Sequence, residues 1–207
     1  MIAVLLPSRG LVHSRTMQDI LANVLGTDLD VGFYFSHGNN IPDSHNLVVE
    51  EAMKDKPDYL WLVEDDMQLP PGILKELLEA HTDIALADYP VRGDQHSVTR
   101  NKDGEFLYGG LGCVLIKKKV FKEKLAPPFF RTDYSYTPDM EQVEPMGNHG
   151  LLDVDFYQQC KWARIEVKVI NMTAGHYFLK SPELPKFGND TGSQYKVETW
   201  SFSQPWK

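Results

Sequence analysis

Short apolar segments that alternate with amphipathic segments constrain the fold of this chain more than any other feature. The segments IAVLLP (residues 2–7) and YLWLV (59–63) are apolar on both sides, which is typical of central strands in a parallel sheet. Between them, SRTMQDILANVLG (14–26) carries apolar residues at helical spacing, and DVGFYFS (30–36) indicates another strand. This alternation predicts an α/β fold with a mostly parallel central sheet and helices on both faces.

The same alternation continues along the chain. Helices are expected over 45–55, 69–81 and 153–164, strands over 83–90 and 165–177, a hairpin over 97–108, and a strand running into a short helix over 112–125. Residues 126–150 are rich in proline, glycine, aromatic and polar residues, which indicates a functional loop or lid. Residues 180–207 predict an irregular tail.

Composition limits the class of protein. The length of 207 residues suits a single domain, 1–207, and the formal net charge of −8 argues against a general nucleic-acid-binding surface. Cys113 and Cys160 lie in apolar or amphipathic stretches, which favours buried thiols over a disulfide or a metal pair. No apolar run approaches the ~20 residues of a membrane-spanning helix, and no signal peptide precedes Pro7, so a soluble, cytoplasmic protein is expected.

Polar residues follow each of the first three predicted strands. PSRG (7–10) follows the first strand, SHGNN (36–40) the second, and Glu64-Asp65-Asp66 the third. Open α/β sheets bind ligands beyond the carboxyl ends of their strands. The sequence therefore predicts a binding site at this edge of the sheet.

The three consecutive acids admit two interpretations. Like charges repel each other unless solvent or a cation compensates, and in extended backbone Glu64 and Asp66 project to one side while Asp65 projects to the other. Two carboxylates on one side can share a divalent ion. The alternative is a solvated turn in which Asp65 or Asp66 helps to cap the following helix.

Five segments in order resemble the GT-A class of nucleotide-sugar glycosyltransferases, especially the small inverting enzymes similar to family 2. They are AVLLPSRG (3–10), IPDSHNLVVEEAMKDKPDYLWLVEDDM (41–67), YGGLGCVLIKKKVF (108–121), LLDVDFYQQCKWARIEVKV (151–169) and TAGHY (173–177). The second contains the Asp-x-Asp-like motif. The chain departs from the family where Glu64 replaces the first Asp of that motif, where His45 stands at a common Arg position, and where Leu152 replaces an acid.

The resemblance implies a metal-dependent glycosyltransferase of the hexosyltransferase type. It would move a sugar from a nucleoside-diphosphate sugar, foremost a UDP-sugar, to a hydroxyl acceptor with inversion. Asp66 and His176 would ligate a divalent cation, with Mn²⁺ preferred to Mg²⁺ because of the imidazole. Asp153 or Asp155 would be the base that takes the acceptor proton, and the choice between them stays open.

The resemblance also implies a set of donor-binding residues: Pro7, Ser8, Arg9, His45, Asn46, Glu64, Asp65, Arg92, Gly110 and Gly112. His45 and Asn46 would begin a helix whose backbone N–H groups favour phosphate. The glycines would let a sugar approach the backbone. Arg9 would contact a base edge or a phosphate, or form a surface ion pair. Arg92 would contact the diphosphate or the sugar, or lie in a solvated loop.

The resemblance also divides the chain and leaves alternatives. Residues 1–100 would form the nucleotide-sugar-binding half, 101–179 the acceptor and catalytic half, and 180–207 a tail or lid. A sugar nucleotidyltransferase would carry a more glycine-rich turn than LLPSRGLVHS (5–14). A non-catalytic nucleotide-sugar-binding module would keep Asp66 and His176, and it remains the stronger alternative.

Overall fold

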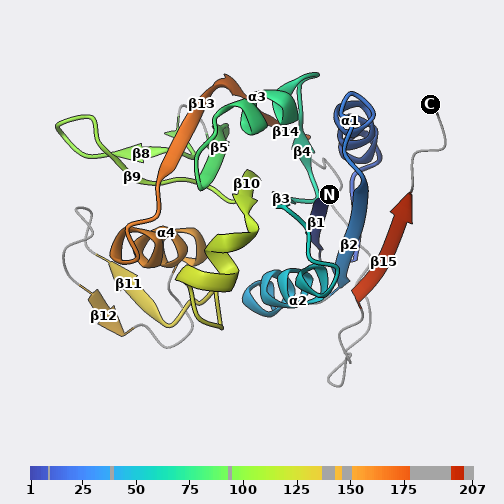
Figure 1. The fold of residues 1–207 in the computed structure, drawn as a ribbon. Helices are drawn as coiled ribbons and strands as arrows, with labels where there is room; N and C mark the ends of the chain where they lie inside the picture. The colour runs from blue at the N-terminus through green and yellow to red at the C-terminus, as the bar shows by residue number, and fades with distance from the viewer. Residues whose placement is uncertain are drawn as a thin grey trace.

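The central element of the fold is a seven-stranded mixed sheet with the strand order β13-β5-β10-β3-β1-β2-β15 (Figure 1). The computed structural model describes residues 1–8, 10–37, 40–92, 95–136, 143–145, 151–177 and 197–202. The strands of the sheet are β1 (Ile2–Ser8), β2 (Val31–His37), β3 (Tyr59–Val63), β5 (Ile84–Asp88), β10 (Cys113–Lys117), β13 (Val167–Thr173) and β15 (Val197–Phe202). All run in one direction except β10 and β15, which are antiparallel to their neighbours.

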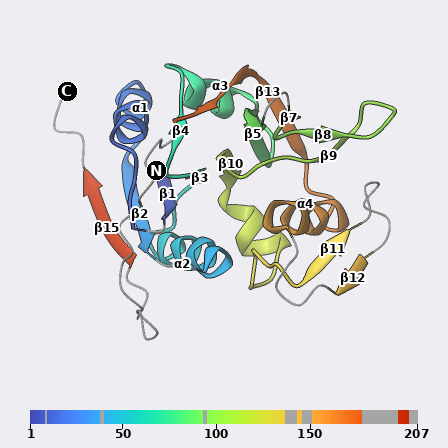
Figure 2. The same cartoon turned by 180° about the vertical axis from the view of Figure 1, so that it is seen from behind.

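Helices cover both faces of this sheet, as Figures 1 and 2 show. One face is covered by α1 (Ser14–Val24) and α3 (Ile73–Glu79), and the other by α2 (Ile41–Lys54), α4 (Leu152–Trp162) and the short π-helix η1 (Val120–Lys124). Side chains of β3 alternate between the two faces and so contribute to both hydrophobic cores. Trp61 packs in the core on the side of α1 and α3, and Leu62 in the core on the side of α2 and α4. The predicted α/β fold, with a mostly parallel sheet between two helical layers, is confirmed.

Four two-stranded ribbons complete the described structure. They are β4 (Met67–Gln68) with β14 (Gly175–His176), β6 (Pro90–Arg92) with β7 (Gln95–His96), β8 (Thr99–Arg100) with β9 (Phe106–Tyr108), and β11 (Tyr134–Tyr136) with β12 (Val143–Pro145). The ribbon β8–β9 is the predicted hairpin, and Gly104 supplies the positive φ of 84° that its turn needs. The ribbons β4–β14, β6–β7 and β8–β9 come after strands β3, β5 and β13 of the large sheet and lie at the edge where polar residues were expected.

Helix starts differ from the sequence prediction. α2 begins at Ile41 rather than His45, because Pro42 suits a first helical turn and Asp43 adds a favourable charge there. α1 is capped by His13, whose Nδ1 accepts a hydrogen bond from the backbone N–H of Arg15. Ser14, where the segment of helical spacing begins, is the first helical residue.

The segment expected to be an irregular tail contains the edge strand β15. Its sequence, VETWSF, is rich in the β-branched and aromatic residues that favour strands, and it pairs antiparallel with β2. The rest of 178–207 lies outside the described residues. In the predicted loop or lid, 126–136 and 143–145 are described and contain β11 and β12, whereas 137–142 and 146–150 lie outside.

The cysteine prediction is confirmed, since Cys113 and Cys160 are both buried and free. Within the described ranges, no helix combines the length and the apolar character that crossing a membrane requires.

Candidate functional site

A cleft of about 860 Å³ lies at the carboxyl edge of the sheet. Residues at or just beyond the ends of β1, β3 and β5 line it, together with the first turns of α2, the ribbons β6–β9, the start of α4 and β14. Of the predicted site residues, the lining includes Pro7, Ser8, His45, Glu64, Asp65, Asp66, Gly110, Asp153 and His176. Strand ends far apart in sequence therefore meet where the polar clusters predicted a site.

Glu64, Asp66 and His176 come together in this cleft. One potential ligand atom from each lies within 4.8 Å of the other two. Nε2 of His176 is 3.9 Å from Oδ1 of Asp66, and the histidine side chain is 12% exposed while the aspartate is 37% exposed. Such a partly shielded group of two carboxylates and one imidazole can surround a divalent cation.

The backbone and the neighbours of His176 orient its ring. Strand β14 pairs with β4, and the N–H of Tyr177 donates to the carbonyl of Asp66 at 2.7 Å. Nδ1 of His176 lies 3.0 Å from the carbonyl oxygen of Pro90, and the ring packs edge-on against Tyr89. Because a carbonyl can only accept, Nδ1 carries the proton and Nε2 keeps its lone pair. This is the orientation that second-sphere hydrogen bonds give to metal-ligating histidines.

The donor set fits a divalent metal ion. The carboxylates of Glu64 and Asp66 supply hard oxygen ligands, and Nε2 of His176 supplies a nitrogen that suits Mn²⁺ or Zn²⁺ better than Mg²⁺. Asp65 is placed differently, because its Oδ2 lies 3.2 Å from the hydroxyl of Ser8 and its carbonyl accepts from the N–H of His13. Glu64 thus lies with Asp66 and His176 in a metal-competent group, whereas the family resemblance placed it among the donor-binding residues.

Asp153 and Asp155 occupy different environments at the start of α4. Asp153 lines the cleft, its Oδ1 accepts from the N–H of Val154, and burial raises the pKa of its carboxyl. Asp155 is fully buried and receives two hydrogen bonds from Arg131, at 3.0 and 3.3 Å, and one from Gln159 at 2.7 Å. Of the two candidate bases, the structure brings Asp153 to the cleft and ties Asp155 to the protein interior.

The glycines before β10 make room for protein side chains. A Cβ at Gly110 would overlap the hydroxyl of Tyr89, and one at Gly112 would lie 2.7 Å from Sδ of Met67. The N–H of Gly112 also donates to that hydroxyl at 3.0 Å. The expected bare surface for a sugar is therefore largely occupied by Tyr89, although Gly110 still lines the cleft.

His45 lies in the second turn of α2, and its ring is almost fully buried. Nδ1 is 2.8 Å from the carbonyl of Ile41, the ring packs against Phe130, and the buried Nε2 has no hydrogen-bond partner among the described residues. Burial lowers the pKa of His45 to about 4. The ring is therefore neutral near pH 7, with Nδ1 donating to the carbonyl of Ile41 and Nε2 buried.

Asn46 is absent from the described lining of the cleft. Its side chain donates to the carbonyls of Pro42 and Phe130 and accepts from the N–H groups of Phe129 and Phe130. It therefore ties the segment after η1 to α2. Because α2 begins at Ile41, the expectation that His45 and Asn46 open the helix and offer free N–H groups to phosphate is wrong.

Two predicted arginines cannot be placed at the site. Arg9 lies outside the described residues, and for Arg92 the structure describes the backbone, in β6, but not the side chain. Both stay predictions.

Several cleft residues were missed by the sequence analysis. They include Ser44, Tyr89, His96, Thr99 and Tyr108. Tyr89 directly follows β5, so the same strand-end rule that selected the acids could have selected it. His96 and Thr99 reach the cleft through hairpins whose register the sequence pattern does not specify.

Burial of His45 predicts a pH-dependent stability. The unfolded ring binds a proton near pH 6.5 but the folded ring only near pH 4, so the unfolded state binds more protons between these values. The free energy of unfolding should therefore fall by about 3 kcal/mol for this residue as the pH is lowered from 7 to 4. Urea denaturation of wild type and His45→Gln at both pH values measures it. The variant should lose about that much less, whereas His81→Asn, at an exposed histidine, should behave as wild type; equal losses in all three proteins would contradict the prediction.

Comparisons with known proteins give a fold but no family. No family model and no curated protein matches the sequence. The chain is similar to the crystal structure of A197 from STIV, with 19% identity and a TM-score of 0.58 over 86% of this chain and 85% of that chain. A provisionally assigned nucleotide-diphospho-sugar transferase from Desulfovibrio desulfuricans G20 has 16% identity and a TM-score of 0.45 over 82% of this chain and 79% of that chain. The similarity to A197 shows that the two chains share an α/β fold over most of their lengths.

Proposed function

We propose that this protein is a metal-dependent glycosyltransferase that moves a sugar from a nucleoside-diphosphate sugar to a hydroxyl acceptor. A UDP-sugar is the first choice of donor, before a GDP- or dTDP-sugar. The observation that carries the proposal is the meeting of Glu64, Asp66 and His176 in one cleft with Asp153. A metal-competent group and a partly buried carboxylate in one cleft are what transfer from a diphosphate leaving group requires.

The metal-competent group would act on the leaving group of the reaction. Glu64, Asp66 and His176 would hold Mn²⁺, which when bound supplies a Lewis acid that stabilises the negative charge of the departing diphosphate. The hydrogen bond from His176 to Pro90 keeps Nε2 ready to ligate without a change of ring orientation.

Asp153 would act on the nucleophile, which is the acceptor hydroxyl. An acceptor hydroxyl is a poor nucleophile, and a carboxylate within hydrogen-bond reach can take its proton during attack, typically adding ~10²–10⁴ in rate. Burial raises the pKa of Asp153, which brings its proton affinity closer to what a base needs near neutral pH. Attack on the face opposite the leaving group would invert the anomeric centre.

The nucleoside would lie between β1 and α2. Pro7, Ser8 and His45 border this side of the cleft. Nε2 of His45 is itself buried, so contact with the nucleoside would come from Pro7 and Ser8.

Donor hydrolysis without an acceptor tests the proposed function. The full chain is incubated with Mn²⁺ and, separately, a panel of UDP-, GDP- and dTDP-sugars, and release of the nucleoside diphosphate is followed. We expect slow release from one nucleotide class, strongest for UDP, that stops when EDTA is added. If no nucleotide sugar is hydrolysed and none gives a thermal shift, the proposal is refuted.

A further inference from the structure

His96 lines the cleft but belongs neither to the metal group nor to the start of α4. It lies on β7, across the ribbon from Pro90, and its side chain is 54% exposed. Nδ1 of His96 is 2.8 Å from Oδ2 of Asp88, the last residue of β5. The ring is therefore held from one side, while most of it faces the open cleft or solvent.

Asp88 is fixed more firmly than an ordinary surface carboxylate. Its Oδ1 accepts hydrogen bonds from the N–H of Tyr89 at 2.9 Å, the hydroxyl of Ser97 at 3.0 Å and the N–H of Val98 at 3.0 Å. These three bonds shape the chain between β5 and β8 and leave Oδ2 for the imidazole. Nδ1–H donates to Oδ2, so Nε2, on the opposite side of the ring, is the atom left for a ligand.

The contact between Asp88 and His96 is not needed to hold the fold. The bonds to Oδ1 already fix the turn, and a half-exposed pair of this kind typically contributes ~0–1 kcal/mol to stability. What the contact does fix is the tautomer and the direction of an imidazole in a cleft. A carboxylate that orients a histidine in this way is common where Nε2 has a function.

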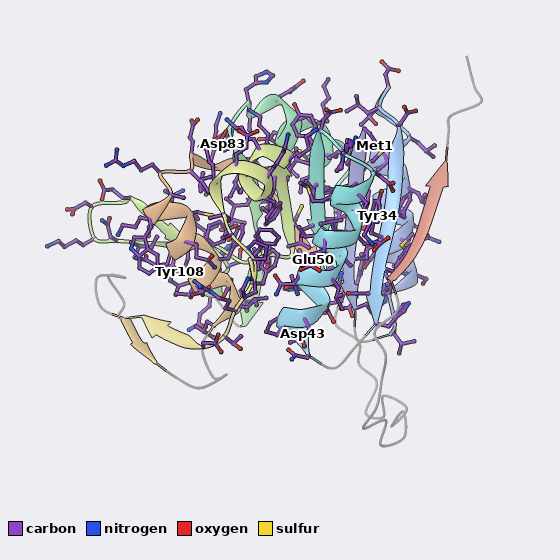
Figure 3. The ribbon with its side chains drawn as sticks, turned by 60° about the horizontal axis from the view of Figure 1, so that its bottom comes forward. Met1, Tyr34, Asp43, Glu50, Asp83 and Tyr108 are labelled. Atoms are coloured by element: carbon purple, nitrogen blue, oxygen red, sulfur yellow. The ribbon has the colours of Figure 1, made fainter. Side chains whose placement is uncertain are left out.

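The neighbours of His96 in the lining indicate the ligand. On the same ribbons, the cleft is lined by the polar side chains Gln95, Thr99 and Tyr108, the last of which is labelled in Figure 3. These are neutral hydrogen-bonding groups with one aromatic ring, in contrast to the carboxylates beyond β3. Neutral, directional donors and acceptors recognise hydroxyl groups, and an aromatic ring adds an apolar face.

We propose that β7, β8 and β9 form a carbohydrate subsite in which Nε2 of His96, oriented by Asp88, accepts a hydrogen bond from a sugar hydroxyl. This rests on the proposed function for the identity of the reaction, but the binding chemistry is independent of it. The sugar belongs either to the donor or to the acceptor. Both present the same hydroxyl chemistry, and the experiment separates them.

The experiment compares wild type, His96→Ala and the control His81→Asn, all as the full chain with Mn²⁺. Calorimetry measures affinity for UDP, UDP-glucose, UDP-galactose and UDP-N-acetylglucosamine, and saturation-transfer NMR measures binding of the methyl glycosides of the same sugars. If the subsite takes the donor sugar, His96→Ala weakens binding of the preferred UDP-sugar ~10-fold, the size of one lost hydrogen bond, and leaves UDP within about twofold. If the subsite takes the acceptor sugar, His96→Ala leaves the affinity for the UDP-sugar unchanged. The saturation-transfer signals that wild type gives with the methyl glycosides are then absent in the variant.

A further variant separates a role in binding from a role in structure. In Asp88→Asn the amide can donate to Nδ1, which moves the ring proton to Nε2; ¹⁵N chemical shifts of His96 report this change of tautomer. Sugar binding should then fall, although by less than in His96→Ala, because a sugar hydroxyl can also accept from Nε2–H. Sugar binding that survives both variants would overturn the subsite, as would equal losses for UDP and UDP-sugars. If wild type binds no nucleotide, the proposed function fails, whereas the glycoside measurement still decides the subsite.

Discussion

Asp66→Asn should remove Mn²⁺-dependent release of UDP from the donor and lower Mn²⁺ affinity more than ~100-fold. Loss of an outer partner of a metal ligand already costs ~10–100-fold in affinity, and this change removes a charged oxygen from the inner group. Oδ1 of Asp66 lies 3.9 Å from Nε2 of His176, so the two side chains are placed to share one ion. His176→Asn should show the same loss. Calorimetric titration with Mn²⁺ measures affinity directly and needs no substrate.

The control for this experiment is Glu50→Gln. Glu50 is an exposed acid on α2, labelled in Figure 3 and absent from the described lining of the cleft, so its substitution removes one negative charge elsewhere. It should bind Mn²⁺ as wild type does. Glu64→Gln then separates two roles: a weakening as large as that of Asp66→Asn identifies a direct ligand, and a weakening of ~10-fold or less indicates contact through water. Wild-type affinity in both Asp66→Asn and His176→Asn would refute the metal site.

The location of the cleft could be predicted from the sequence because strand direction is regular. Parallel strands end at the same edge, so Ser8 at the end of β1 and Asp66 after β3 were expected to lie near each other once the alternation was recognised. His176 was harder, since it depends on the two-residue pairing of β14 with β4. The resemblance to a family, rather than any periodicity, selected that residue.

The roles of several other residues depend on contacts between segments that are far apart in the sequence. No pattern in a single sequence identifies such contacts. Gly110 resembles a ligand-facing glycine, but the neighbour that requires it is Tyr89, at the end of another strand. Asn46 resembles a helix cap, and its partners are Phe129 and Phe130. The dyad of Asp88 and His96 likewise depends on the register of a short hairpin.

Asp153 and Asp155 show which feature of the site can be predicted from the sequence and which cannot. Two positions apart on a helix, side chains point in nearly opposite directions, so the sequence could have predicted that one faces the cleft and the other does not. Which one faces the cleft depends on Arg131, which precedes α4 by many residues and forms an ion pair with Asp155.

The two aspartates should therefore respond in opposite ways to the same substitution. Asp153→Asn should lower the rate of donor hydrolysis by ~10²–10⁴ because the base that takes the proton of the attacking water or hydroxyl is lost. Stability should not fall, because burial already disfavours the charged form of this carboxyl, as its raised pKa shows. Affinity for UDP should stay at the wild-type value.

Asp155→Asn should instead destabilise the fold by about 3 kcal/mol, since it removes the buried carboxylate that Arg131 contacts. The folded fraction should retain its turnover per molecule, because Asp155 does not reach the described lining of the cleft. Urea denaturation and hydrolysis rates, measured on the same preparations, separate the two effects. A loss of turnover in Asp155→Asn with no loss in Asp153→Asn would reverse the assignment of the base. If neither variant changes any rate because wild type shows none, while UDP and Mn²⁺ still bind, the protein is a nucleotide-sugar-binding module, and the raised pKa of Asp153 reflects only its burial at the start of α4.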